Sequence, residues 1–147
     1  MPRPGEPRFN HVAMSMPSAA LSPEGRKEIV DFYSDVFGWK ELPTETIDGK
    51  RLVMMAYRID QFVFLIADDR PLSAPRLDHF GMGVATLDEL DTFLERAKRY
   101  QEREPRVDII DKQVEVHPGI TLTNFYVGFL LPLMVEVQHF GYDRAGG

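Results

Sequence analysis

The sequence predicts an α+β fold of two βαβββ modules whose mixed sheets curl around a cleft. The first observation is a repeat: residues 9–14 (FNHVAM) and 77–82 (LDHFGM) both place a histidine third, close to half of the 147-residue chain apart. The second is an amphipathic helix pattern after each copy, and the third is a set of three strand patterns after each helix. One helix covers only one face of each sheet. The two uncovered faces are therefore expected to enclose a cleft.

We expect the first module over residues 8–68. Its first strand is 9–16, with His11 and Met14 on opposite faces. Its helix starts after the N-cap Ser22 and ends at Gly38. Inside the helix, apolar residues recur at helical spacing: Ile29, Phe32, Tyr33, Val36 and Phe37. Three strands are expected to follow, with turns at Asp48-Gly49 and at 58–61, over residues 39–47, 51–57 and 62–67.

The second module is expected over residues 76–140, after a linker at 69–75. A strand at 77–84 precedes a capping box formed by Thr86 and Glu89. The helix stripe that follows is Leu87, Leu90, Phe93, Leu94 and Ala97. Three strands then surround a Pro118-Gly119 turn, over residues 107–116, 120–129 and 133–140. Residues 1–7 are expected to be a disordered lead, and 141–147 a tail.

Composition excludes several classes of function. A net charge of −6 offers no electrostatic reason to bind nucleic acid or an anionic membrane. No apolar run approaches the length of a membrane span. The absence of cysteine excludes disulfides and thiolate metal sites, and it fits a reducing compartment, so a cytoplasmic location is expected.

The two histidines are the candidate functional residues that the repeat itself indicates. A duplicated module with a histidine at the same place in each copy can bring both imidazoles to one shared centre. If a carboxylate meets His11 and His79 there, the centre is a metal site.

From residue 9 to residue 140, the repeat and the order of elements resemble the vicinal-oxygen-chelate superfamily. This group includes glyoxalase I, methylmalonyl-CoA epimerase, fosfomycin-resistance thiol transferases, bleomycin-binding proteins and extradiol catechol dioxygenases. The resemblance implies a glyoxalase/dioxygenase fold with metal ligands on the first and last strand of each module. His11 and His79 match the first-strand positions, and Glu136 matches the last-strand carboxylate of the second module. The matching stretch of the first module, 62–66, offers Phe64 and no ligand.

Two imidazoles and one carboxylate hold a divalent ion and leave coordination positions open. The resemblance therefore implies Fe(II), with Mn(II) as the other candidate, and it argues against the four-ligand Zn or Ni sites of glyoxalase I and the epimerase. For Glu136 the alternative is a solvated strand glutamate. Its neighbours Val135 and Val137 favour an inward charge, which is normally paired or metal-bound.

The spacing before Glu136 resembles the extradiol dioxygenase signature. It comprises His117, seven further residues, the pair Phe125-Tyr126, and then Pro132. By this resemblance His117 and Tyr126 are catalytic and donate hydrogen bonds to substrate and oxygen. The alternatives are an exposed turn histidine and a core tyrosine.

Two more residues follow Glu136 on the same strand pattern. Gln138 shares the inward face with Glu136 and can line the pocket. His139, at an odd offset, falls on the opposite face and is expected to be structural.

The resemblance to extradiol dioxygenases implies a dioxygenase-like enzyme that acts on a small aromatic or vicinal-oxygen substrate. One alternative is a non-redox metal-dependent lyase, isomerase or transferase of the same superfamily. The other is a metal-free protein that binds a small molecule, as in bleomycin resistance. The resemblance also implies a homodimer.

Overall fold

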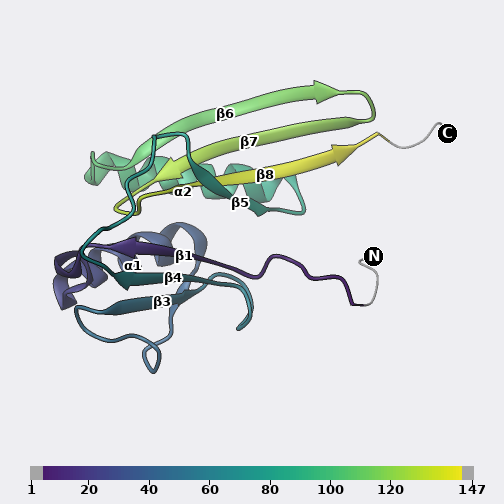
Figure 1. The fold of residues 1–147 in the computed structure, drawn as a ribbon. Helices are drawn as coiled ribbons and strands as arrows, with labels where there is room; N and C mark the ends of the chain where they lie inside the picture. The colour runs from purple at the N-terminus through teal and green to yellow at the C-terminus, as the bar shows by residue number, and fades with distance from the viewer. Residues whose placement is uncertain (1–4, 144–147) are drawn as a thin grey trace. The chain divides into compact units, whose positions relative to one another are not determined.

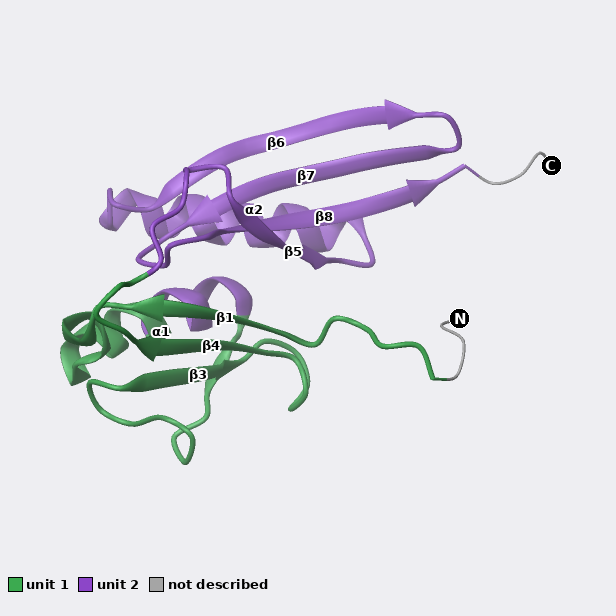
Figure 2. Cartoon of the chain, in the orientation of Figure 1, with its two compact units in different colours: residues 1–30, 38–71 green, residues 31–37, 72–147 purple. Residues whose placement is uncertain are grey.

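A computed structural model describes residues 5–143 (Figure 1). The chain divides into two compact units, residues 1–30 with 38–71 and residues 31–37 with 72–147 (Figure 2). Each unit contains a four-stranded mixed sheet, and the order of elements is βαβββ in both halves of the chain. This confirms the predicted α+β class and its duplicated module.

The sheet of the first unit has the strand order β1-β4-β3-β2. These strands are β1 (His11–Met16), β2 (Lys40–Glu41), β3 (Arg51–Met55) and β4 (Phe62–Ala67). β1 and β4 are parallel, and the other pairs are antiparallel. Met14 and Met16 are buried while His11 is exposed, so the predicted alternation along β1 is confirmed.

The first helix, α1 (Pro23–Phe37), has the predicted bounds. The Ser22 hydroxyl accepts a hydrogen bond from the Gly25 amide at 3.1 Å, which caps the helix. Gly38 ends it with a φ of 74°, a conformation that glycine adopts without strain. A short 3₁₀ helix, η1 (Ser18–Leu21), precedes α1 and was not predicted.

The strand predicted over residues 39–47 is wrong beyond Glu41. Pro43 has no N–H to donate to a ladder. The Thr46 hydroxyl bonds the Leu42 carbonyl at 3.1 Å and accepts from the Val53 amide at 3.3 Å, which takes backbone groups away from regular pairing. Ile47 forms only an isolated bridge to Arg51, across the predicted Asp48-Gly49 turn.

The sheet of the second unit repeats the topology as β5-β8-β7-β6. Its strands are β5 (His79–Gly83), β6 (Asp108–His117), β7 (Ile120–Gly128) and β8 (Met134–Tyr142). β8 extends two residues beyond the predicted end at residue 140, because Gly141 and Tyr142 continue the ladder with β7. Residues 144–147 of the predicted tail and 1–4 of the predicted lead lie outside the described residues.

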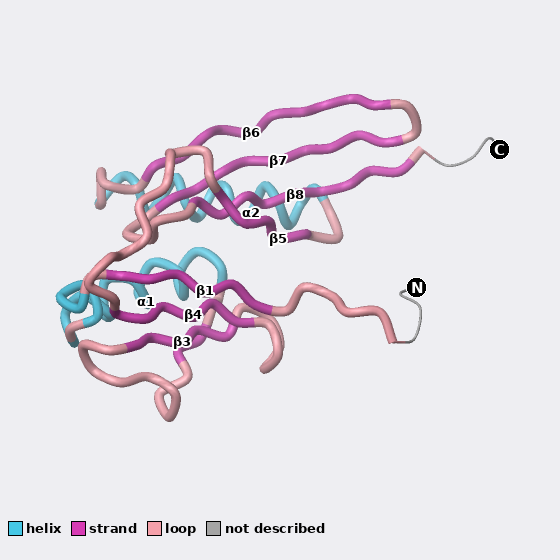
Figure 3. The backbone as a smooth tube through the Cα atoms, viewed as in Figure 1, coloured by secondary structure: helices cyan, strands magenta, loops and turns pink. Residues whose placement is uncertain are grey.

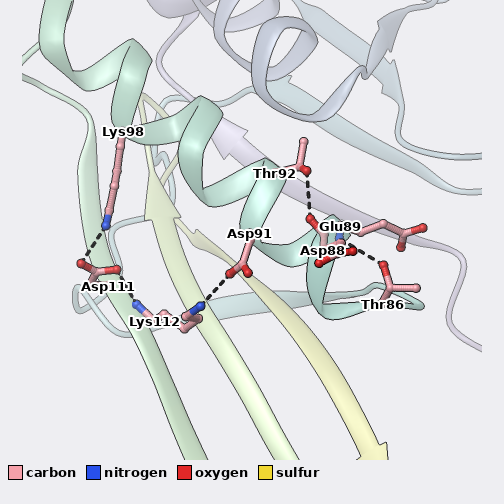
Figure 4. Close-up of polar contacts among 8 residues, drawn as sticks. All are labelled: Thr86, Asp88, Glu89, Asp91, Thr92, Lys98, Asp111 and Lys112. Atoms are coloured by element: carbon pink, nitrogen blue, oxygen red, sulfur yellow. Dashed lines mark hydrogen bonds and ion pairs between the residues drawn. The ribbon is translucent and has the colours of Figure 1, made fainter.

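The second helix, α2 (Leu87–Arg103), packs over β6, β7 and β8 and buries Leu90, Leu94 and Ala97 against the sheet. Thr86 caps it by accepting from the Glu89 amide at 3.1 Å, as the capping box predicts (Figure 4). The helices that the structure describes include none with the length and apolar character of a membrane span.

The last turns of α1 belong to the second unit (Figure 2). The Phe32 ring lies 4.8 Å from that of Phe129 and 5.0 Å from that of Tyr100. The buried Tyr33 hydroxyl donates to the Phe129 carbonyl at 2.8 Å, and burial raises the pKa of this phenol well above its usual value.

Two residues of a β-bulge in β6 form ion pairs with α2. The register slips between Ile110 and Gln113, so Asp111 and Lys112 share one partner position on β7. Each reaches a charge on the helix: Lys98 meets Asp111 at 2.9 Å and Lys112 meets Asp91 at 2.7 Å (Figure 4). The bulge thus provides two ion pairs where a regular strand would place only one of the two side chains on this face.

Candidate metal centre

The candidate centre lies near the start of β8. Glu136 pairs with Gly81 on β5 and with Tyr126 on β7, and it is only 4% exposed. Burying a carboxylate is unfavourable unless hydrogen bonds and an opposite charge compensate for lost water. The hydrogen-bond and charge partners of Glu136 therefore show how its burial is compensated.

Uncharged donors provide most of that compensation. Asn124 Nδ2 donates to Glu136 Oε2 at 2.5 Å, and Gln138 Nε2 donates to Oε1 at 2.5 Å. Burial, and then a hydrogen bond to Glu136, raises the pKa of the Tyr126 hydroxyl. Tyr126 therefore keeps its proton at neutral pH and acts as a donor. Among the described residues, neither lysine nor arginine pairs with Glu136.

Glu136 also faces His79, whose Nε2 lies 3.4 Å from Oε1. His79 Nδ1 lies 2.7 Å from the Leu77 carbonyl oxygen, which can only accept, so Nδ1 carries the proton. In the neutral ring, Nε2 then has a lone pair that faces a carboxylate oxygen. Two such atoms are stabilised by a cation between them, either a proton or a metal ion.

The distance between these two atoms fits a shared metal ion. Nitrogen and oxygen ligands lie about 2.0–2.2 Å from a zinc-sized ion, so two of them on one ion are roughly 3–3.5 Å apart. The 3.4 Å between His79 Nε2 and Glu136 Oε1 falls in this range. Within the second unit, the described residues provide these two ligand types together and no third.

The first unit has a matching histidine without the carboxylate. His11 pairs with Phe62 and Ala13 with Phe64, as His79 pairs with Met134 and Gly81 with Glu136. By register, Phe64 therefore occupies the position of Glu136, as the sequence predicts.

His11 is held in the same tautomer as His79. Its Nδ1 lies 2.5 Å from Asn10 Oδ1, which accepts, so its Nε2 has the lone pair. Its ring stacks on Phe62 at 4.7 Å. His11 belongs to the first unit, and its place in the ligand set stays a prediction.

Of the two predicted catalytic residues, the structure brings Tyr126 to the cluster and leaves His117 apart from it. The Tyr126 and His79 rings meet edge to face at 5.0 Å. His117 pairs with Ile120 at the far end of the β6–β7 hairpin, is exposed, and lies 3.4 Å from Glu115. The turn at 118–119 makes the strands antiparallel, so the sequence spacing separates His117 from Tyr126 by roughly 20 Å.

Gln138 was predicted on the face of Glu136, and its hydrogen bond to that side chain confirms this. Asn124 was not predicted. Its signal was available: an amide in an apolar strand, two residues before Tyr126 and therefore on the same face. His139 pairs with Thr123, one position away from the Gln138–Asn124 pair, and so falls on the other face as expected.

Comparison with known proteins finds similar folds among solved structures. Fosfomycin resistance protein FosX from Listeria monocytogenes, crystallised with Mn(II) and sulfate, has a TM-score of 0.60 at 14% identity, covering 90% of this chain and 89% of that one. Lactoylglutathione lyase from Agrobacterium tumefaciens has a TM-score of 0.57 at 15% identity, covering 92% and 95%. A glyoxalase family protein from Bacillus anthracis has a TM-score of 0.61 at 15% identity, covering 95% and 99%.

No family model matches this sequence, and no curated protein matches it. The likeness is therefore one of fold, carried by the paired βαβββ modules over nine-tenths of the chain or more in each of these three comparisons. The chain has the fold of the vicinal-oxygen-chelate superfamily.

Proposed function

We propose that this protein is a divalent-metal-dependent enzyme that acts on a small molecule with two neighbouring oxygen atoms. His79, Glu136 and His11 are the proposed ligands. The observation that carries the proposal is the buried Glu136 carboxylate, which faces the Nε2 lone pair of His79 and otherwise has only uncharged donors.

A buried anion of this kind calls for a cation. Neutral hydrogen bonds replace lost water, but they do not balance the charge. An imidazole with its Nδ1 proton held by a backbone carbonyl is the usual form of a histidine ligand. His11 has the equivalent register and the same tautomer, which supports including it as the third ligand.

The metal ion would polarise substrate oxygens as a Lewis acid. The residues of this chain then position the reactants. The Leu77 carbonyl fixes the His79 ring, and the protonated Tyr126 hydroxyl donates a hydrogen bond beside Glu136. When the metal ion balances the charge of Glu136, this single proton becomes available to a substrate oxygen on which negative charge develops.

The reaction class we favour is non-redox: addition, elimination or isomerisation, with Mn(II) as the metal. The Mn(II) in the FosX structure and the lyase among the similar structures support this class. A second candidate is an Fe(II)-dependent extradiol dioxygenase, favoured by the place of Tyr126 beside His79 and Glu136. The position of His117 removes one part of the signature that supports it.

Elemental analysis of protein purified without chelators tests the proposal. We expect about one divalent ion per chain. His79→Ala, Glu136→Ala and His11→Ala should each lose it, while His139→Ala and His117→Ala, the matched controls, should retain it. A metal-free wild-type protein would support the small-molecule binding protein instead. Retention of the ion by His11→Ala would remove this residue from the ligand set.

Oxygen consumption then separates the two reaction classes. The metal-loaded protein is assayed with a catechol panel under air and under nitrogen. Uptake of O₂ with Fe(II) bound supports the dioxygenase. Turnover of a vicinal-oxygen substrate that is equal with and without O₂ supports the non-redox class. Sedimentation of the same sample tests the proposed homodimer.

A further inference from the structure

Two amide side chains hold the carboxylate of Glu136, and we call Asn124 and Gln138 the amide clamp. Asn124 reaches Oε2 from β7, and Gln138 reaches Oε1 from two residues along β8, each at 2.5 Å. Each oxygen therefore has one clamp donor. Oε1, the oxygen held by Gln138, is also the one that lies 3.4 Å from His79 Nε2.

The fold leaves space for this arrangement at Gly81. Gly81 is the register partner of Glu136 on β5. A Cβ at this position would lie 3.3 Å from Gln138 Oε1 and 3.9 Å from Glu136 Oε1. Because glycine has no side chain, the Gln138 amide has room next to Gly81 and beside the carboxylate. The equivalent residue in the first unit, where the partner is Phe64, is Ala13.

The orientation of Asn124 satisfies the Glu136 carboxylate and leaves the Asn124 side-chain oxygen without a hydrogen bond. The residue is 3% exposed, and its Oδ1 has no hydrogen-bond partner among the described residues. A carboxylate can only accept, so Nδ2 must face Glu136 and Oδ1 must face away. An unpaired buried oxygen is unfavourable for folding. Packing stability alone therefore does not account for an amide here.

We infer that the amide clamp positions Glu136 for the cation: it aims Oε1 at His79 Nε2 and, being uncharged, leaves the full negative charge of the carboxylate available. A lysine or arginine at either place would donate equally well but would neutralise the charge. The inference rests on the proposed function, and Asn124 and Gln138 are positioning residues in it, because they act through Glu136.

Three variants of Gln138 and one control test this with Mn(II) titration of the metal-free protein. Gln138→Met keeps the length and removes the donor, and we expect binding to weaken about 10–100-fold at unchanged stoichiometry. Gln138→Lys keeps a donor and adds a charge, and it should bind more weakly than Gln138→Met. Gln138→Glu also lacks the donor but adds a negative charge, so its comparison with Gln138→Met shows the effect of charge without the hydrogen bond. Gln113→Met is the control, because Gln113 is an exposed glutamine that pairs with Asn124 on the same sheet.

The outcomes distinguish the clamp from the metal site. If Gln138→Met and Gln138→Lys bind Mn(II) as the wild type does, while His79→Ala does not bind, the clamp is wrong and the metal site stands. If Gln138→Lys binds as well as the wild type, the requirement for an uncharged donor is wrong.

A readout without metal covers the case in which the wild type binds no Mn(II) and the proposed function fails. The side-chain amide resonances of Asn124 and Gln138 are compared between the wild type and Glu136→Gln by NMR. We expect both NH₂ groups to shift, and Glu115→Gln, the control, to leave them in place. Unshifted amides in Glu136→Gln would show that the clamp does not form.

Discussion

Leu130 has a backbone conformation that residues with a Cβ normally avoid. Its φ is 61°, in the turn between β7 and β8 that leads the chain into the strand of Glu136. In this region the Cβ lies too close to the following carbonyl oxygen, which costs roughly 1–2 kcal/mol. The turn therefore stores strain close to the candidate site.

Replacing Leu130 tests this strain. We expect Leu130→Gly to be more stable than Leu130→Ala by about 1 kcal/mol, because both lose the side chain and only alanine keeps the strained Cβ. Urea denaturation measures the two free energies of unfolding. The same pair at Val116, which is 77% exposed in β6, is the control and should show the opposite order. Equal stability of the two Leu130 variants would contradict the strain.

Several individual residues of the candidate site could be predicted from the sequence. The family resemblance indicated Glu136 and the matching Phe64, and strand alternation placed Gln138 on the face of Glu136. The strand of Asn124 showed that it shares a face with Tyr126, but not that it reaches Glu136, because the cross-strand register is not visible in one segment. His117 was placed with Tyr126 by the resemblance to the extradiol dioxygenase signature, which does not take account of the reversal at the hairpin.

Among the elements, α2 has the more complete N-terminal cap. Thr86 accepts from the Glu89 amide, and the Glu89 carboxylate accepts from the Ala85 amide at 2.9 Å. Thr86→Ala removes one of these bonds, and we expect a loss of about 1 kcal/mol in thermal unfolding. Thr92→Ala is the matched control on the same helix, where the hydroxyl only returns to the Asp88 carbonyl (Figure 4). This control should be neutral or slightly stabilising.

An ion pair joins the segment before β5 to the start of β6. Arg76 donates to both oxygens of Asp108, at 2.7 and 2.8 Å, and these hydrogen bonds lower the pKa of Asp108. A carboxyl whose folded pKa lies below its unfolded value of about 3.9 stabilises the fold above that pH. This contribution disappears as the pH falls through the folded pKa.

We therefore expect Asp108→Asn to be less stable than the wild type at neutral pH, with the difference closing below about pH 4. Chemical denaturation over a pH series measures this. Asp60→Asn, at an exposed aspartate, is the control and should follow the wild-type curve throughout. A constant gap between Asp108→Asn and the wild type down to pH 2 would show that the ion pair is not its source.

Element types were predictable where periodicity and caps agree, as in α1 and α2. The failures have local causes. Residues 42–47 have strand-like composition, but Pro43 and the Thr46 hydroxyl divert the backbone groups. The bulge at Asp111 and Lys112 depends on charges of α2, which lie far away in sequence.

For the molecule as a whole, the linker is not the boundary of two independent pieces. Residues 31–37 belong with 72–147 (Figure 2). The ring of Phe32 in α1 packs on Phe129, which follows β7 (Figure 3 shows α1 as a helix and β7 as a strand). A fragment of residues 72–147 lacks that ring. We expect it to lose cooperative unfolding, because Phe129 and Tyr100 would expose apolar surface.

Far-UV circular dichroism with thermal melting tests the fragment. The control is the complete chain cut once between residues 69 and 75, which keeps residues 31–37 and should melt close to the intact protein. A cooperative transition of the 72–147 fragment at the same temperature as the intact chain would show that residues 31–37 are dispensable. The sequence did not indicate this division, since a helix pattern does not show which sheet each of its turns joins.

Because the two units share one strand register, equivalent backbone positions of their sheets can be compared within one molecule. β1–β4 and β5–β8 are parallel pairs of the same layout, one centred on the phenyl ring of Phe64 and the other on the charge of Glu136. Backbone amides at matched positions of the two pairs exchange with solvent in one sample, at one temperature and one pH. Their protection factors therefore compare an apolar and an ionised strand centre directly, without a mutation and without a second protein.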